Sequence, residues 1–458
     1  MDVIYTLAGN IIDTNYENLP SEVVKATKRL FMDGLGVGLA GSAEAGVSEL
    51  IDIVRDWDGR RESTVWVYGD RLPCVSAAQA NATMIHALDY DDTHDVAILH
   101  ASSVAVPTAL AIAEKLGGVD GKRLITAVAL AVDLAARLCL ANKVSVFDRG
   151  WQYTAIHGNF SAAAITGKLL GLDTETLVSA FGLAYHQAGG NLQCIHDGTL
   201  AKRAGPGFAA RDGIMAALMA QKGITGARNV LQGRDGLFNV YHRGDYNPEV
   251  LTANLGEKFE VVNLSFKPYP CCRNTNPPID ATLTMVGEYN IKAEDVDSVT
   301  IYVSKGAMKL LGEPLSTKQN PSTTVDAQFS IPWAVASAIV KGKVGIAEFT
   351  PQAIKDKTVL ALSNKVTPKL DESLNRMGVS PAIVEIKTKD GKVYSKRVDT
   401  PYGSPENPMS MDAMAAKLRD CASYAAKPLS QKNVEKLIQL VSRLEAVSDV
   451  EEVVRLLV

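Results

Sequence analysis

The spacing of the apolar residues changes once along the chain, and this change constrains the fold more than any other feature. Up to about Asn263 they recur at helical spacing, as Val47, Leu50, Ile51 and Val54 do on one face. Ala-rich runs continue the pattern at 77–88, 105–116, 124–140, 162–170 and 208–220. Small side chains at this density let helices approach closely. The pattern therefore predicts a compact helical domain, interrupted by one short strand at 64–68.

Beyond this point the pattern changes to that of strands. Val299, Ile301 and Val303 alternate with polar neighbours, as in a half-buried strand. The segments 383–388 and 392–398 flank Asp390-Gly391, a dipeptide that favours a tight hairpin turn because glycine tolerates positive φ. A helical run at 328–340 lies between the strand and the hairpin. These patterns predict a smaller α+β domain.

Helical signals return from Met411 onward. The sequence thus predicts a mainly α protein in which both chain ends form one large all-helical domain, with an α+β domain inserted between them. We expect the helical domain to span 1–265 and 411–458, and the α+β domain to span 266–410.

Charge and composition exclude several classes of partner. The formal net charge of −4 disfavours a general nucleic-acid partner, because phosphate neutralisation favours a basic domain. The most apolar stretch, 124–140, contains Asp133 and Arg137, so a buried helix is expected rather than a membrane span. The first nine residues lack a basic region and a cleavage site, and the six cysteines form no CxxC pair. We therefore expect a cytoplasmic protein with reduced thiols.

Gly36, Gly38 and Gly41 match the spacing G-x-G-x-x-G. A dinucleotide site needs a strand before these glycines and a helix that opens at them. Here a helical pattern precedes them. The glycines are therefore interpreted as helix-packing residues, and no dinucleotide cofactor is expected.

The densest group of chemically active residues is the segment 86–100, HALDYDDTHDVAILH. Its three histidines and four aspartates could ligate a metal ion. They could equally form a capped helix end with solvated charges. His100 is suited to general acid or base catalysis, because the ordinary pKa of histidine lies near working pH.

Four segments together resemble a known family. The segment 86–94 is similar to its H-x-L-D-[FY]-D-D-T-[HW] stretch, 197–203 (DGTLAKR) to its D-G-[ST]-x-x-K-R stretch, and 266–273 (FKPYPCCR) to its F-K-x-Y-P-x-C-R stretch. His157-Gly158 leads into a helix ending KLLGL in the same order. This pattern resembles the MmgE/PrpD family, which includes 2-methylcitrate dehydratase, cis-aconitate decarboxylase and iminodisuccinate epimerase. The resemblance implies the same two-domain fold.

The resemblance also implies which residues line the active site. Asp89, Thr93, His100, Lys202 and Lys267 match positions in the family's pocket. Lys202 and His100 are the preferred proton carriers, whereas Asp89 and Thr93 would orient the site.

Arginines beside the matched lysines complete the expected set. Arg203, Lys267 and Arg273 would bind substrate carboxylates, since guanidinium groups bind carboxylates through paired hydrogen bonds. Cys271 and Cys272 are expected to pack as small apolar groups.

One position departs from the decarboxylase branch of the family. Where that branch has a catalytic histidine, this sequence has Gln152, which cannot exchange a proton near pH 7. Tyr153 is the third candidate proton carrier. Dehydration needs an additional acid for the departing hydroxyl, whereas epimerisation needs only two proton carriers and a stabilised enediolate.

These considerations place epimerisation of an iminodisuccinate-like dicarboxylate first, by proton transfer next to a carboxylate. Dehydration of a 2-methylcitrate-like tricarboxylate is the alternative. A non-catalytic binder of small carboxylates and a metal hydrolase are the candidates from other classes. We expect no metal, no organic cofactor and, from the family resemblance, a homodimer.

Overall fold

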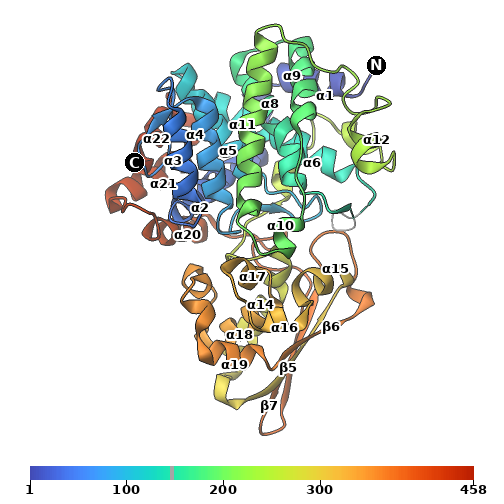
Figure 1. Ribbon diagram of the computed structural model, residues 1–458, viewed down its shortest axis with the longest axis vertical. Coiled ribbons are helices and arrows are strands. Elements are labelled where there is room, and N and C mark those ends of the chain that lie inside the picture. The colour runs from blue at the N-terminus through green and yellow to red at the C-terminus, as the bar shows by residue number, and fades with distance from the viewer. Residues whose placement is uncertain (145–148) are drawn as a thin grey trace. The chain divides into compact units, whose positions relative to one another are not determined.

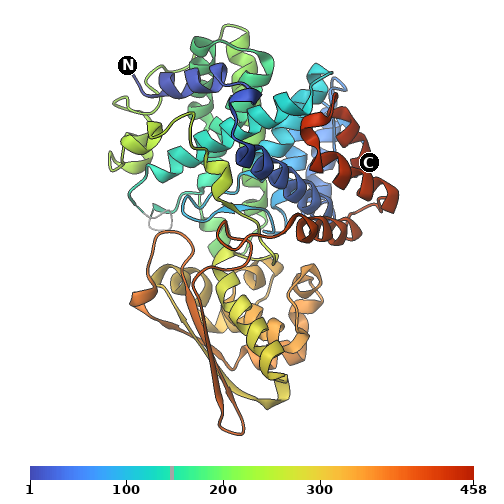
Figure 2. The ribbon, with the colours of Figure 1, turned by 180° about the vertical axis from the view of Figure 1, so that it is seen from behind.

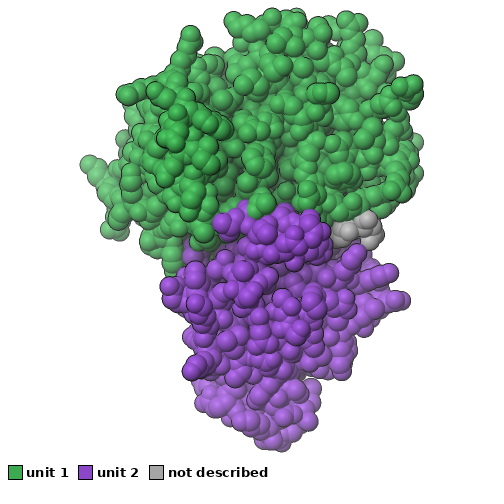
Figure 3. Space-filling view, in the orientation of Figure 1, with its two compact units in different colours: residues 1–192, 201–264, 410–458 green, residues 193–200, 265–409 purple. Residues whose placement is uncertain are grey.

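The computed structural model of the chain describes residues 1–144 and 149–458. The chain divides into two compact units (Figure 3). Unit 1 comprises Met1–Leu192, Ala201–Leu264 and Ser410–Val458, and unit 2 comprises Gln193–Leu200 and Ser265–Met409. Unit 1 is built mainly of helices from both chain ends, and unit 2 contains a four-stranded sheet with helices. The fold class predicted from the sequence is therefore confirmed.

The elements of unit 1 can be followed in Figure 1. Its longer helices are α1 (Ile4–Asp13), α2 (Ser21–Gly41), α3 (Val47–Trp57), α4 (Cys74–His86), α5 (Ser102–Leu116), α6 (Gly121–Leu140), α8 (Tyr153–Leu170), α9 (Thr174–Gln187), α11 (Ala201–Gln221), α20 (Met411–Ser423) and α21 (Gln431–Ser442). Its short helical elements are η1 (Tyr16–Asn18), α12 (Leu237–His242), α13 (Glu249–Thr252), η2 (Glu260–Asn263), η9 (Leu444–Ala446), α22 (Glu451–Val454) and η10 (Arg455–Leu457). Its short strands are β1 (Ser63–Thr64), β2 (Arg71–Leu72) and β3 (Thr93–His94), and β4 (Leu264–Ser265) lies at its boundary.

Side-chain caps fix where several of these helices begin. The Asp120 carboxylate accepts the Arg123 amide at the start of α6, and Asp173 accepts the Thr176 amide at the start of α9. Such caps satisfy amide groups that have no partner within the first turn. The helices predicted from the Ala-rich runs are confirmed, and they correspond to α4, α5, α6, α8 and α11.

Helix α11 packs closely against α8 and α4. A Cβ at Gly207 would lie 2.5 Å from Thr83 Oγ1 of α4, and one at Gly213 would lie 2.5 Å from Ala162 Cβ of α8. Larger residues at these positions would push the helices apart. The small residues of α11 therefore set how closely its first turn approaches the end of α4.

The G-x-G-x-x-G sequence lies within α2, as the packing interpretation predicted. A Cβ at Gly38 would contact Trp66 and Ile85 at 3.1 Å. These glycines thus allow α2 to pack against its neighbours.

The strand predicted at 64–68 is wrong beyond Thr64. The Val65 amide donates to the Asp70 carbonyl and the Gly69 amide donates to the Val65 carbonyl, which makes a turn. Val67 has φ +66°, and its amide donates to the carbonyl of Leu457. The apolar residues of this segment are buried by a turn rather than by sheet pairing.

Unit 2 contains a four-stranded sheet in the order β6-β5-β7-β8. Its strands are β5 (Val296–Val303), β6 (Val366–Leu370), β7 (Ala382–Thr388) and β8 (Val393–Val398). Its helical elements are α10 (Gln193–His196), η3 (Arg273–Thr275), α14 (Asn276–Tyr289), η4 (Ala293–Asp295), α15 (Lys305–Ala307), η5 (Met308–Gly312), α16 (Leu315–Gln319), α17 (Thr324–Gln328), α18 (Ile331–Lys341), η6 (Ile346–Phe349), η7 (Ala353–Lys355), α19 (Lys357–Ser363) and η8 (Glu372–Leu374).

The sheet has mixed strand directions. Strand β5 pairs in parallel with β6, with Val299 opposite Val366, and antiparallel with β7, with Ile301 opposite Val384. The β7–β8 hairpin turns at Asp390-Gly391, where Gly391 has φ +87°, as predicted. Helix α14 packs against β7 and β8, and α18 packs against α14.

The C-terminal helices return to the N-terminal part of unit 1. Figure 2 shows the red helices from the chain end beside the dark blue α2, and α20 packs against α2. Within the residues that the structure describes, no helix is long and apolar enough to cross a membrane.

Candidate active site

The candidate site of unit 1 forms where the end of α4 meets the first turn of α11. His86 is the last residue of α4, and Lys202 is the second residue of α11. The Lys202 Nζ atom lies 2.9 Å from His86 Nε2 and also donates to the Asp89 carboxylate. All three residues are buried. Two residues that the sequence singled out, Asp89 and Lys202, are therefore in direct contact.

The backbone after α4 turns sharply at Asp89. This residue has φ +51°, in the left-handed region that aspartate tolerates better than most residues. The turn places the carboxylate of Asp89 on Lys202 and that of Asp91 on His86. A strained backbone at a cluster of charged side chains is typical of functional sites.

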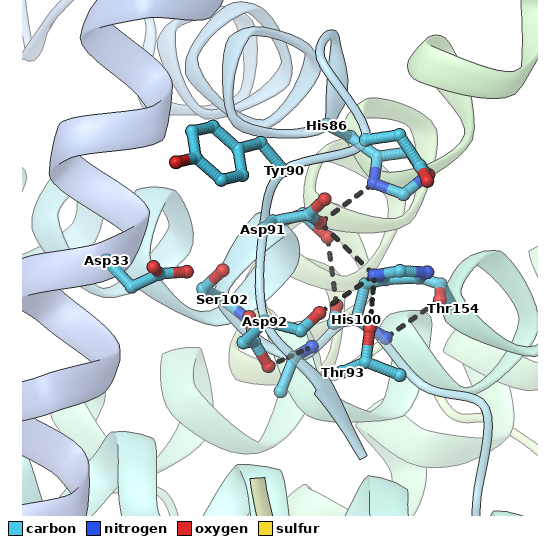
Figure 4. Close-up of polar contacts among 12 residues, drawn as sticks. Asp33, His86, Tyr90, Asp91, Asp92, Thr93, His100, Ser102 and Thr154 are labelled. Atoms are coloured by element: carbon cyan, nitrogen blue, oxygen red, sulfur yellow. Dashed lines mark hydrogen bonds and ion pairs between the residues drawn. The ribbon is translucent and has the colours of Figure 1, made fainter. Parts of the chain in front are cut away.

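His86 connects Asp91 with Lys202. Its Nδ1 lies 2.8 Å from Asp91 Oδ2 (Figure 4), and its Nε2 faces the ammonium of Lys202. The Asp91 carboxylate accepts a hydrogen bond from Nδ1–H, and Nε2 accepts a hydrogen bond from the Lys202 ammonium, so His86 is neutral with its proton on Nδ1. Burial also lowers the pKa of His86 below its ordinary value, against the opposing charge of Asp91.

His100 lies beside this group, with its ring centroid 4.9 Å from that of His86. Its Nδ1 is 2.8 Å from the carbonyl oxygen of Asp92, 3.3 Å from Thr93 Oγ1 and 3.6 Å from Asp91 Oδ2 (Figure 4). A carbonyl oxygen can only accept, so Nδ1 carries the proton. The lone pair of His100 is then on Nε2, where it can take a proton from a substrate.

The segment that carries His100 is held by a short, strained loop. The His94 amide donates to the Leu99 carbonyl at 2.8 Å, and Ile98 has φ +54°, which is rare for a β-branched residue. The His100 amide in turn donates to Thr154 Oγ1 at 3.1 Å. The backbone at His100 is therefore held both by the loop before it and by Thr154 of α8, which limits where the imidazole can lie.

Asp92 points away from the histidines and caps α5. Its carboxylate accepts the amides of Ala101 and Ser102 at 3.1 and 2.8 Å (Figure 4). Burial, followed by the charge of Asp91, raises the pKa of Asp92 to about 7. Adjacent aspartates thus have different tasks: Asp91 contacts the histidines, and Asp92 anchors the helix that follows them.

The donor atoms of His86, Asp91 and His100 lie within 4.8 Å of one another, as in a possible metal site. However, the hydrogen bond from His100 to the Asp92 carbonyl requires a proton on Nδ1, which removes that lone pair as a ligand. The Asp91 oxygen nearest both rings also accepts from His86. The arrangement fits a hydrogen-bonded network better than a cation site.

Tyr153, the third predicted proton carrier, lies in a different buried cluster. Its hydroxyl is hydrogen-bonded to Asn142 and is 3.5 Å from His242 Nδ1, and its ring packs edge-on against His157. Burial raises the pKa of Tyr153 and lowers that of His242 to about 4. The contacts of Tyr153 with Asn142, His157 and His242 thus place it in this cluster.

Gln152, the residue just before α8, contacts the backbone of Lys202. Its Nε2 donates to the carbonyl of Lys202 at 3.4 Å, and its side chain packs against Gly205. The position at which the decarboxylase branch has a histidine is therefore next to the backbone of Lys202. Arg203, one residue further, donates to the Ala45 carbonyl at 2.7 Å and pairs with Glu44.

Lys267 and Arg273 belong to unit 2. Lys267 is fully buried there. Arg273 donates to Asn276 Oδ1, to the Tyr402 carbonyl and to Ser404 Oγ at 2.9, 2.9 and 2.6 Å. Cys271 is buried with its thiol 2.9 Å from Thr275 Oγ1, as expected for a packing residue.

His86 and Asp91 were not among the predicted site residues. The sequence placed His86 and Asp91 only in a group of histidines and aspartates that could ligate a metal ion or form a capped helix end. The spacing gave a weak signal, since a turn after a helix can bring residues five positions apart together. Nothing local indicated that His86 would also contact Lys202, which is 116 positions away.

Comparison with protein families gives two matches that together cover most of the chain. The model described as the MmgE/PrpD N-terminal domain matches residues 5–249, and the model described as the MmgE/PrpD C-terminal domain matches residues 269–446.

Several curated proteins are similar over nearly their whole length. A cis-aconitate decarboxylase-like protein, oryM, of Aspergillus oryzae is 26% identical, covering 100% of this chain and 97% of its own. Cis-aconitate decarboxylase of Aspergillus terreus is 26% identical, covering 95% and 92%. Cis-aconitate decarboxylase of Homo sapiens is 27% identical, covering 94% and 89%.

Proposed function

The chain belongs to the MmgE/PrpD family and is an enzyme of small carboxylates, and from this we propose that it moves a proton at the carbon next to a substrate carboxylate. Lys202 and His100 are the two proton carriers of this proposal. The substrate is a small di- or tricarboxylate.

The contact of Lys202 with both Asp89 and His86 is the observation that carries the proposal. A lysine held by a carboxylate and a neutral imidazole is positioned rather than solvated. His100 supplies a second carrier, since its proton on Nδ1 leaves Nε2 able to exchange one. Lys267 and Arg273 remain proposed carboxylate-binding residues, on the resemblance of the 266–273 segment.

We place a lyase reaction first. The similar curated proteins are named as decarboxylases, which are lyases, and this supports the lyase class over the isomerase class. Within that class, elimination of water from a 2-methylcitrate-like acid uses both carriers. In this step Lys202 acts as a neutral amine and removes the proton next to the carboxylate. His100, which must then hold a proton on both nitrogens, gives the one on Nε2 to the departing hydroxyl, so water leaves and a double bond forms.

Epimerisation is the second candidate, and Gln152 favours it. The amide beside Lys202 cannot replace the acid that the decarboxylase branch has at this position. Epimerisation requires only that one carrier removes the proton and the other returns it to the opposite face.

Incubation of the enzyme with 2-methylcitrate, cis-aconitate and iminodisuccinate in D₂O, followed by proton NMR, tests the proposal. A new alkene signal from 2-methylcitrate is the expected result. Loss of carbon dioxide from cis-aconitate would instead support decarboxylation, and deuterium incorporation with an unchanged carbon skeleton would support epimerisation.

Saturable binding of these acids by the folded protein, without exchange or product, would contradict the proposal. That outcome would favour a non-catalytic carboxylate binder. A homodimer and a cytoplasmic location remain predictions from the sequence.

A further inference from the structure

The ammonium of Lys202 is held by two acceptors of different kinds. One proton is directed at the carboxylate of Asp89, and a second is directed at His86 Nε2, 2.9 Å away. When Lys202 gives up its third proton, the two remaining N–H groups can keep both hydrogen bonds. The lone pair of the neutral amine is then confined to the direction that the third proton left.

His86 can hold Lys202 in this way only in one tautomer. Its Nε2 must have a lone pair, so its proton must be on Nδ1. Asp91 Oδ2, 2.8 Å from Nδ1, selects this tautomer. Both residues are fully buried, so water cannot substitute easily for either partner.

We propose that His86 and Asp91 are positioning residues, which fix the direction of the reactive proton or lone pair of Lys202. Asp91 sets the tautomer of His86, and His86 sets the orientation of the lysine. Neither residue exchanges a proton with the substrate. The inference rests on the proposed role of Lys202 as a proton carrier.

Two substitutions of His86 separate this role from simple packing. The amide of asparagine reaches the place of Nδ1 and can donate to Asp91, but it offers Lys202 no acceptor in the place of Nε2, so that Lys202 keeps its contact with Asp89 and loses the one with position 86. The longer glutamine reaches the place of Nε2 and can accept from Lys202. Both remove the ring, so each serves as the packing control for the other.

We expect His86→Asn to lower kcat about thirtyfold or more with KM within about twofold, because orientation is lost and carboxylate binding is retained. We expect His86→Gln to keep kcat within about fivefold of the wild-type value. The assay uses the compound among 2-methylcitrate, cis-aconitate and iminodisuccinate that the wild type converts. Equal losses in the two variants would overturn the proposal.

Asp91→Asn tests the tautomer with almost no change in shape. An amide at position 91 can donate to His86 Nδ1, which moves the proton of His86 to Nε2 and opposes Lys202. A wrong histidine tautomer of this kind costs about 10⁴ in kcat in a serine protease triad. Here we expect a loss of about a hundredfold.

The double variant Asp91→Asn/His86→Gln measures how much of the effect of Asp91 acts through the tautomer of His86. If Asp91 acts by setting the tautomer, Asp91→Asn should cost little more once His86→Gln is present. Because Asp91 also lies 3.6 Å from His100 Nδ1, any remaining loss measures that second contact. An Asp91→Asn effect that is as large in the His86→Gln background as in the wild type would overturn the proposal.

Nitrogen NMR of ¹⁵N-histidine-labelled protein gives a readout that needs neither turnover nor a stable His86 variant. The wild type should show His86 as the neutral Nδ1–H tautomer, and Asp91→Asn should shift it to Nε2–H. A wild-type His86 with its proton on Nε2, or on both nitrogens, would overturn the inference.

Lys202→Arg distinguishes failure of this inference from failure of the proposed function. An inactive Lys202→Arg enzyme together with a fully active His86→Asn enzyme would refute only the positioning role. An active Lys202→Arg enzyme with normal deuterium exchange would refute the function on which it rests.

Discussion

The ammonium nitrogen of Lys202 lies 2.9 Å from His86 Nε2, and this contact joins two helices whose residues are far apart in the sequence. Lys202 has two possible tasks, which are to bind a substrate carboxylate and to carry a proton. A lysine that only binds an anion could be replaced by another cation, whereas a lysine that carries a proton could not, because guanidinium stays protonated.

Lys202→Arg should therefore lower kcat by about a hundredfold or more and leave KM nearly unchanged. Deuterium exchange into the substrate should fall in parallel. Lys168→Arg is the matched control, since Lys168 is a half-buried lysine that donates to the backbone carbonyls of Ile12 and Thr14 and lies outside the candidate site. A variant with raised KM and normal kcat would assign Lys202 to carboxylate binding.

His100→Asn should separate removal of the substrate proton from the later protonation of the departing hydroxyl. The asparagine amide can keep the hydrogen bond to the Asp92 carbonyl, but it has no group in the place of Nε2. We expect product formation to fall about a hundredfold while exchange next to the carboxylate persists. The exposed His186 provides the control variant His186→Asn. If exchange disappears with turnover, His100 rather than Lys202 removes the proton.

Asp92→Asn should change how stability depends on pH. Burial raises the pKa of Asp92 from its unfolded value of 3.8 to about 7. Between these values the unfolded state is ionised and the folded state keeps its proton, so the wild type loses stability as pH rises. The variant lacks this loss.

Urea unfolding at pH 5 and pH 8 measures the effect. The free energy of unfolding of Asp92→Asn minus that of the wild type should be about 2–3 kcal/mol higher at pH 8 than at pH 5, which means that the variant is relatively more stable at pH 8. Asp399→Asn, at an exposed position, should show a difference below about 0.5 kcal/mol. A constant difference at both pH values would mean that Asp92 ionises normally.

Arg137→Met should destabilise unit 1 strongly. The buried guanidinium pairs with Asp133 at 2.7 Å and donates to the carbonyls of Ala253 and Lys258 at 2.8 Å. Its removal leaves the Asp133 charge and these carbonyls without that partner, which costs about 3–5 kcal/mol. Arg455→Met breaks an exposed pair and should cost less than about 1 kcal/mol. Thermal unfolding of both variants compares them directly, and similar losses would contradict the prediction.

Prolonged chelation should leave activity intact. Hydrogen bonds of His86 Nδ1 to Asp91 and of His100 Nδ1 to the Asp92 carbonyl already hold the group of His86, Asp91 and His100 together, so we expect it to work without a cation. Turnover before and after dialysis against EDTA, with elemental analysis of both samples, provides the test. Stoichiometric metal whose removal abolishes turnover, and whose return restores it, would show that the network is a metal site.

The sequence predicted the helices of unit 1 well because the apolar residues that each helix buries lie close together in the sequence, at helical spacing or in Ala-rich runs. Helix α6, for example, is apolar and buried over most of its length, and its Arg137 pairs with Asp133 four positions before it. Lys202 and His100 were singled out because both lie in segments that resemble family motifs, and their roles as proton carriers stay predictions.

The contacts between these segments could not be predicted in the same way. Asp91 and Asp92 are identical neighbours in the sequence, yet one faces His86 and the other caps α5. That difference depends on the turn at Asp89 and on the close packing of α11 against α4. The strand wrongly expected at 65–68 failed for a similar reason, because the amide of Val67 bonds to Leu457 near the end of the chain.

Lys417 shows when during synthesis the surroundings of the site can be completed. This residue of α20 donates to Asp33 at 2.7 Å and to the carbonyl of Tyr90 at 2.9 Å, and it follows Tyr90 by 327 positions. The ribosome therefore releases the segment 86–100 long before the cation that anchors it. Until α20 has emerged, Asp33 lacks this partner, so the nascent chain can complete these contacts only after residue 417 has been translated.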